Sequence, residues 1–257
     1  MKKKPVGGRK FWKAGGNNLF ADYLRVAPFS HALWRTLEAR ALEKVKINGP
    51  VLDIGCGFGE FAGVCFQGKV EMGVDINEKD LFLAAQKKKY RRLLFADARN
   101  LPFADNSFRT VISISTLEHI EGVETVFRES YRVLRRGGRL IYTVPTKTAN
   151  RYLVCPGLFH LVFKHRSVLS ERQWQELAVK AGFKIRRSEG LLSARQLTFY
   201  QLGLAAAFLT QINRWLWGRR MLFSPSWRSR WLSKALGWLV FDRQVTGANL
   251  LVVAEKD

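Results

Sequence analysis

The chain has 257 residues, a net charge of +22 and a hydrophobic fraction of 47%. This composition excludes a disordered chain and fits a single α/β domain with an appendage. The three cysteines are odd in number and form no CxxC pair, so neither a disulfide framework nor a metal site is indicated. No apolar run follows the basic start MKKKPVGGRK. We therefore expect no secretory signal and a cytoplasmic protein.

The positive charge is concentrated at the two ends of the chain. Residues 1–46 hold 11 basic and 3 acidic side chains, residues 47–185 hold 21 and 14, and residues 186–257 hold 11 and 4. A basic surface favours an anionic partner such as nucleic acid, anionic lipid or a phosphorylated substrate. A charge that only serves solubility is the alternative.

The elements follow an alternating order along the chain. Residues 1–18 are rich in Lys, Gly and Asn and predict a flexible basic arm. Residues 19–46 predict one or two helices, because apolar side chains recur there at helical spacing. Seven short apolar runs then predict strands, at 51–54, 70–75, 92–97, 109–115, 139–145, 183–190 and 249–256. Helical patterns separate the earlier strands, at 59–67, 78–90, 122–135 and 171–180. This alternation predicts a parallel sheet with helices on both faces.

A glycine-rich turn follows the first predicted strand. It reads Asp53-Ile54-Gly55-Cys56-Gly57-Phe58-Gly59, and its glycines let the backbone turn tightly and approach a ligand. Dinucleotide-binding enzymes use a similar turn. Here, however, the carboxylate of Asp53 precedes the first glycine, where it would repel a pyrophosphate and suit the amino group of a methionine-like ligand.

Two further acids stand at the ends of the next two strands. Asp75 is placed to accept hydrogen bonds from two ribose hydroxyls. Asp97 is placed to accept one from an adenine amino group, and Ala98 beside it can line the base. Together the turn and the acids describe a ligand with an amine, a ribose and an adenine but no phosphate.

These segments resemble the class I S-adenosylmethionine-dependent methyltransferases, in particular the group that acts on small molecules, quinones, sterols and lipid-linked substrates. The similarity covers roughly residues 45–190 and rests on VLDIGCGFGEFAG, VEMGVDINEKDL, FADARNLPFADNSFRTVISISTLEHI and RVLRRGGRLIYTVP in this order. The resemblance implies a Rossmann-like, seven-stranded, mostly parallel sheet whose last strand is antiparallel. It implies S-adenosylmethionine as the cofactor and a methyltransferase domain over residues 19–257.

The resemblance also implies which residues hold the cofactor. The turn would cradle the methionine part, Asp75 the ribose, and Asp97 with Ala98 the adenine. The full set of expected cofactor contacts is Asp53, Gly55, Cys56, Gly57, Gly59, Asp75, Ile76, Asp97, Ala98 and Ser115.

Candidates for a general base follow the fourth strand, where the carboxyl ends of the strands form the ligand crevice. His119 could accept a proton near neutral pH, with Glu118 beside it. The alternative is that both side chains only shape the pocket. Tyr142, Thr146 and His165 are further candidates. Base methylation of nucleic acids is not indicated, because SISTLEH replaces a DPPY-like motif and no cysteine stands at that strand end.

The stretch 191–248 predicts a helical insertion before the last strand. Residues 197–213 carry no charge but are slightly short for a membrane span. Five tryptophans follow among cations, at 215, 217, 227, 231 and 238. This pattern is typical of helices at a membrane interface. A lid over the acceptor pocket and a nucleic-acid surface are the other interpretations.

The sequence therefore predicts methyl transfer to a small, hydrophobic or lipid-linked acceptor at an anionic membrane surface. The alternatives are an RNA methyltransferase and a non-catalytic, membrane-associated scaffold that keeps the fold. The intact glycine turn and its three acids argue against lost cofactor binding.

Overall fold

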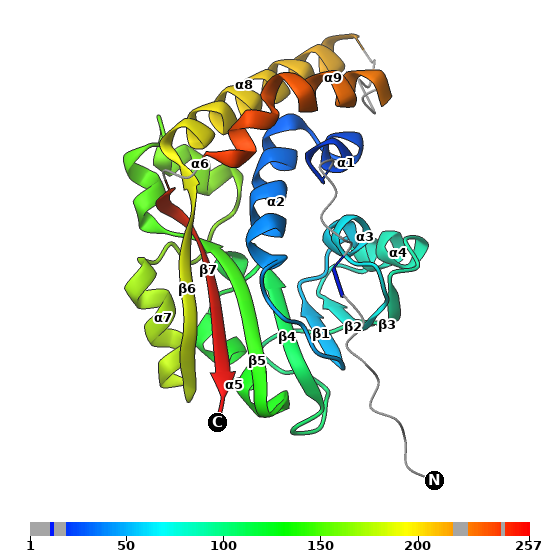
Figure 1. Ribbon diagram of the computed structural model, residues 1–257, viewed down its shortest axis with the longest axis vertical. Coiled ribbons are helices and arrows are strands. Elements are labelled where there is room, and N and C mark those ends of the chain that lie inside the picture. The colour runs from blue at the N-terminus through cyan, green and yellow to red at the C-terminus, as the bar shows by residue number, and fades with distance from the viewer. Residues whose placement is uncertain (1–10, 13–18, 218–225, 243–244) are drawn as a thin grey trace.

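The computed structural model describes residues 11–12, 19–217, 226–242 and 245–257, and the side chains of 207–228 are not described (Figure 1). The strands are β1 (Val51–Ile54), β2 (Val70–Asp75), β3 (Tyr90–Phe95), β4 (Phe108–Ile114), β5 (Leu134–Pro145), β6 (Phe183–Ser193) and β7 (Val245–Lys256). The α-helices are α1 (Leu19–Val26), α2 (Phe29–Leu42), α3 (Glu60–Cys65), α4 (Glu78–Gln86), α5 (Val123–Val133), α6 (Pro156–Val162), α7 (Glu171–Lys180), α8 (Ala194–Trp217) and α9 (Ser226–Leu236). Short 3-10 helices are η1 (Leu117–His119), η2 (Lys147–Arg151) and η3 (Gly237–Phe241).

The strands form one sheet of seven in the order β3-β2-β1-β4-β5-β7-β6. β7 runs antiparallel to both of its neighbours, and the other pairs are parallel. The predicted Rossmann-like sheet and its antiparallel last strand are confirmed. Strand order reverses between β1 and β4, which is where open α/β sheets bind ligands.

Two apolar layers cover the sheet. On one face, the core unites side chains of α1, α2, α3 and α4 with β1 and β4. On the other face, α5 and α7 pack their buried side chains against the same strands. α7 begins at a capping box, in which Ser170 and Gln173 exchange hydrogen bonds with each other's backbone. The helices on both faces therefore follow from the apolar stripes of the sequence.

The structure departs from the predicted elements in several places. β6 and β7 extend into the predicted insertion 191–248, up to Ser193 and from Val245, and β3 begins at Tyr90, where a helix was predicted. α5 ends at Val133, and β5 begins already at Leu134, because Leu134 pairs with Phe108 of β4. Gly137 lies within this strand at φ +69°, and the pairing of β5 with β4 is irregular near this start. The sequence analysis also did not predict α6, whose exposed side chains leave no buried apolar stripe.

The predicted insertion before the last strand consists of α8, α9 and η3. In Figure 1, α8 and α9 lie at the end of the sheet where the parallel strands have their carboxyl ends. α8 lies against α2, and α9 lies against α1. None of the described helices is both long and apolar enough to cross a membrane. The predicted basic arm at 1–18, apart from residues 11–12, lies outside the described residues, as do the side chains of Trp215, Trp217 and Trp227.

Candidate active site

The glycine turn joins β1 to α3 and has a backbone that only glycine adopts easily. Gly55, Gly57 and Gly59 have φ of +70°, +50° and +72°. A Cβ atom on Gly55 would stand 2.1 Å from Cγ2 of Thr116. The absence of a side chain at Gly55 therefore lets the turn approach the loop that follows β4.

The carboxylate of Asp75 ties the turn to the end of β2. Its Oδ2 accepts a hydrogen bond from the backbone N–H of Gly57 (2.8 Å), and its Oδ1 accepts one from the N–H of Asn77 (2.9 Å). Ile76, between Asp75 and Asn77 in the chain, has 64% of its surface exposed. An acid and an exposed apolar side chain thus stand side by side at the strand end.

Asp53 lies beneath the turn with its carboxyl group buried. The Tyr90 hydroxyl donates to its Oδ2 at 2.7 Å. Burial raises the pKa of Asp53 to about 7, and the charge of Asp75 adds to this, although the hydrogen bond from Tyr90 opposes it. An ammonium group placed beside Asp53 would favour its ionised form.

Asp97 follows β3 and forms an ion pair with Arg99. The guanidinium of Arg99 donates to both carboxylate oxygens of Asp97, and Nη2 lies 2.7 Å from Oδ2. These hydrogen bonds lower the pKa of Asp97. Ala98 beside it is buried. An adenine amino group at Asp97 would therefore share the carboxylate with Arg99.

A cavity of about 160 Å³ adjoins the turn. We call it the pocket. α2, the loop after β4, the end of β5, α6 and α8 supply its walls. Its lining residues are His31, Trp34, Arg35, Ser115, Glu118, His119, Pro145, Phe159, Phe163, His165 and Tyr200. The predicted residues Ser115, Glu118 and His119 thus come together here, and aromatic rings form much of the remaining wall.

Glu118 and His119 lie on η1 inside the pocket wall. Glu118 is 2% exposed, and its Oε2 has no hydrogen-bond partner among the described residues. Burial raises the pKa of Glu118 to about 8 and lowers the pKa of His119. Nε2 of His119 stands 3.9 Å from Oε1 of Glu118. Burial, together with the nearby His119 and His160, lowers the pKa of His165 to about 4.

Two other candidates for a general base have structural roles. The hydroxyl of Tyr142 is buried and donates to the carbonyl of Trp174 (3.0 Å). Thr146 donates to the carbonyl of Gly247 (2.5 Å). Neither lines the pocket.

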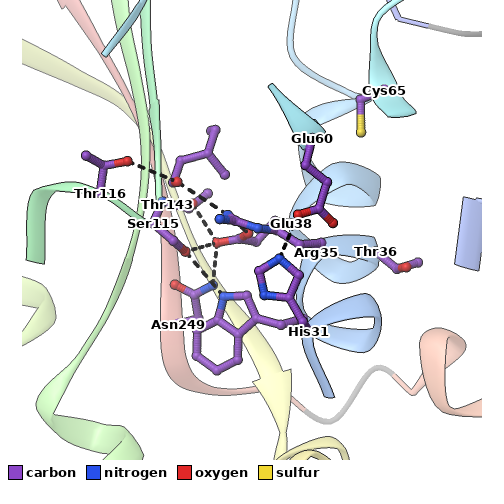
Figure 2. Close-up of polar contacts among 12 residues, drawn as sticks. His31, Arg35, Thr36, Glu38, Glu60, Cys65, Ser115, Thr116, Thr143 and Asn249 are labelled. Carbon is purple, nitrogen blue, oxygen red and sulfur yellow. Dashed lines mark hydrogen bonds and ion pairs between the residues drawn. The ribbon is translucent and has the colours of Figure 1, made fainter. Parts of the chain in front are cut away.

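The floor of the pocket depends on Glu38, which the sequence analysis did not single out. Figure 2 shows its carboxylate surrounded by donors from different elements. Oε1 accepts from Ser115 (2.6 Å), Thr143 (2.7 Å) and Asn249 (3.1 Å). Oε2 accepts from Arg35 at 2.9 Å. Glu38 thus joins α2 to β5, β7 and the loop after β4.

The charge of Glu38 is balanced inside this network. Its side chain is fully buried, and that of Arg35 is 18% exposed. Burial opposes the charge of Arg35, but the Glu38 carboxylate outweighs this and raises the pKa of the guanidinium. Arg35 also donates to the carbonyl of Ile114. The spacing of an Arg three residues before a Glu, on a helix that also carries His31 and Arg40, is the sequence signal of this pair.

The described part of the insertion closes the far side of the pocket. Tyr200 of α8 lines it, with its ring 5.1 Å from that of Trp34. This contact is what the lid interpretation expects. Trp231 and Trp238 are 63% and 50% exposed, which leaves their rings available to an outside surface.

Residues 52–142 match the methyltransferase domain family. They form a class I S-adenosylmethionine-dependent methyltransferase domain. S-adenosylmethionine is the cofactor of this domain. The cofactor turn, Asp75, Asp97, Ser115, Glu118 and His119 all fall within the matched segment.

Several curated methyltransferases are similar to this domain. The O-methyltransferase resE of Aspergillus sclerotiorum is 32% identical over 148 residues, which are 52% of this chain and 54% of that protein. The ubiquinone/menaquinone biosynthesis C-methyltransferase UbiE of Sinorhizobium fredii is 31% identical over 122 residues, 43% of this chain and 47% of that protein. The chain thus spans about half the length of these relatives.

Solved structures share the methyltransferase fold over most of the chain. A methyltransferase from Thermotoga maritima covers 89% of this chain and 91% of its own, with a TM-score of 0.59 and 19% identity. The geranyl diphosphate C-methyltransferase of Streptomyces coelicolor has a TM-score of 0.59 at 14% identity and covers 89% of this chain and 84% of its own. At these identities the likeness concerns the fold.

Replacement of Glu38 by alanine should strongly destabilise the methyltransferase domain. Arg35 would remain buried without its counter-charge, and the three donors at Oε1 would lose their acceptor. The expected loss is about 3–5 kcal/mol of the free energy of unfolding, measured by urea denaturation. Glu43→Ala, at the exposed end of α2, is the control and should cost less than about 0.5 kcal/mol. Equal losses in both variants would contradict the role of the network.

Asp53 should make the cofactor-free protein less stable as the pH rises. Its pKa is about 7 when folded, against 3.8 as the ordinary value, so protonated Asp53 stabilises fully below about pH 4 and the effect is lost as the pH rises through about 7. Asp53→Asn keeps an oxygen for Tyr90 and has no proton to lose. Wild-type stability relative to Asp53→Asn should therefore fall by about 2–4 kcal/mol between pH 4 and pH 7.5. Parallel urea titrations of both proteins would show an unchanged difference if Asp53 were ordinarily acidic.

Proposed function

We propose that this chain transfers the methyl group of S-adenosylmethionine to a small, hydrophobic or lipid-linked acceptor at a membrane surface. The observation that carries this proposal is the pocket beside the glycine turn, with aromatic walls and a few polar groups. A carbonyl-rich quinone or a hydroxylated lipid fits such walls better than a charged nucleic acid does. The similarity to a protein named as an O-methyltransferase and to a ubiquinone/menaquinone C-methyltransferase supports acceptors of this kind.

Methyl transfer from a sulfonium needs alignment and a dry site more than it needs a strong acid or base. In our proposal Asp53, Asp75 and the turn hold the methionine and ribose parts of the cofactor. Ser115, which lines the pocket next to Thr116, would contact the cofactor where it meets the acceptor. Glu118 and His119 are the residues placed to accept a proton if the acceptor is a hydroxyl.

An exposed apolar surface beside the pocket supports the membrane part of the proposal. Phe159 of α6 and Phe163 directly after it line the pocket, whereas Leu158, Leu161 and Val162 are more than half exposed. Val154, just before the helix, is 92% exposed. Apolar side chains gathered in this way mark an interaction surface, and the net charge of +22 favours anionic lipid.

Calorimetric titration with S-adenosylmethionine tests the cofactor site. We expect micromolar binding by the wild-type protein and at least about a tenfold weaker affinity for Asp75→Ala, because two charge-assisted hydrogen bonds to the ribose would be lost. Glu78→Ala, an exposed acid three residues further on, is the control and should bind normally. Thermal unfolding of both variants separates loss of the site from loss of the turn. Undiminished binding by Asp75→Ala would contradict the assigned role.

Co-sedimentation with vesicles tests the membrane surface. The protein should bind vesicles of phosphatidylcholine with one quarter phosphatidylglycerol more strongly than vesicles of phosphatidylcholine alone. Leu161→Glu should weaken binding about tenfold, because it removes one apolar side chain from the bilayer and adds a repelled charge. Val179→Glu on α7, with similar exposure (55% against 74%), is the control. Salt-sensitive RNA binding without vesicle binding would favour the RNA methyltransferase instead.

A further inference from the structure

Three potential metal ligands meet in the pocket wall. Glu118, His119 and His165 each offer one ligand atom, and these atoms lie within 4.8 Å of one another. Glu118 and His119 belong to η1, whereas His165 follows α6. A divalent ion with bonds of about 2.1 Å holds its ligand atoms roughly 3.4 Å apart. Shifts of about 1 Å in the positions of the ligand atoms, through small side-chain rotations, would therefore allow all three to bind one ion.

The hydrogen bonds behind His165 leave its outer nitrogen free to bind a cation. Nε2 of His160 lies 2.8 Å from the Oδ1 of Asn150, an oxygen that only accepts, so this nitrogen carries the hydrogen. Nδ1 of His160 then accepts from Nδ1 of His165 at 2.9 Å. Nε2 of His165 is left with its lone pair. A chain of this kind is typical of histidines that bind a metal, because it fixes both tautomer and orientation.

The same reasoning applies to His119. Its Nδ1 lies 3.4 Å from the backbone carbonyl of Lys164, which can only accept. The hydrogen therefore belongs on Nδ1, and the lone pair of Nε2 points toward the Glu118 side, 3.9 Å from Oε1. Nδ1 of His119 thus donates to a backbone carbonyl, and Nδ1 of His165 donates to His160, which leaves Nε2 of both rings able to bind a cation.

Glu118 is the third potential ligand, and one of its carboxylate oxygens has no hydrogen-bond donor among the described residues. Glu118 lines the pocket, its side chain is 3% exposed, and its buried Oε2 lacks any hydrogen-bond partner among the described residues. A buried carboxylate oxygen without a donor is costly. A cation between Glu118 and the two imidazoles would satisfy it.

We propose that Glu118, His119 and His165 bind a divalent transition-metal ion, such as Zn²⁺, in the pocket, with His160 as a positioning residue. Two imidazoles and one carboxylate are the donor set that zinc accepts while keeping a position open. In the proposed methyltransferase this position would face the acceptor, where the ion would bind an acceptor oxygen. That part rests on the proposed function, whereas metal binding itself does not. With the ion bound, Glu118 and His119 are its ligands and no longer serve as the proton acceptors named above.

Titration of the untagged, chelator-treated protein with Co²⁺ tests the site in the absence of cofactor and acceptor. We expect about one ion per chain, a visible ligand-field absorption typical of low coordination, and competition by Zn²⁺. His165→Ala and Glu118→Gln should each weaken binding at least about 100-fold, and His160→Phe about 10- to 100-fold. Glu118→Gln preserves the shape of the side chain, so it keeps the test valid if His165→Ala folds poorly.

His31→Gln is the matched control. His31 also lines the pocket, but its Nε2 pairs with Glu60 at 3.0 Å, outside the cluster. Cobalt binding by this variant should equal that of the wild type. No saturable Co²⁺ absorption in the wild-type protein, or equal loss in His31→Gln and His165→Ala, would overturn the proposal. Calorimetry with S-adenosylmethionine on the same samples reports separately on the proposed function.

Discussion

The buried carboxylate of Glu38 is the interaction on which the arrangement of the pocket depends. It accepts hydrogen bonds from the end of β4, from β5 and from β7, while Arg35 of its own helix balances its charge. An ionised group can remain so far from water only when every oxygen is satisfied. This requirement holds α2 in one orientation against the sheet, and α2 in turn presents His31, Trp34 and Arg35 to the pocket.

Ser115 and Thr116 connect this network to the cofactor turn. Ser115 adopts a positive φ of +47° and donates to Glu38. Thr116 stands so close to Gly55 that a side chain there would collide with it. The loop after β4 therefore contacts the turn on one side and Glu38 on the other. A left-handed backbone at a non-glycine residue is uncommon, and here it lies where the two halves of the site meet.

The sequence predicts the cofactor half of the site far better than the acceptor half. β1 and β2 appear with their predicted bounds because they are short apolar runs closed by glycine or acid, and α7 does because of its capping box. Asp53 and Asp75 are recognisable by their place near the ends of β1 and β2. Glu38, in contrast, has partners up to 211 residues away in sequence, and α6 carries no amphipathic stripe. The role of Glu38 and the place of α6 can be recognised only in the folded structure, where the sheet brings distant segments together.

The acceptor half also lies largely outside the segment that the family match covers. His31 and Arg35 precede residue 52, and Phe159, His165 and Tyr200 follow residue 142. Most of the residues that line this pocket therefore lie outside the matched segment. Its chemistry must be argued from its contacts, which are the aromatic rings of the lining and the unpartnered carboxylate oxygen of Glu118 beside the imidazoles of His119 and His165.

The two imidazoles are oriented by Asn150, His160 and the Lys164 carbonyl, all of which belong to the segment around α6. The same short segment that carries the exposed apolar surface thus also orients the polar side chains of the pocket.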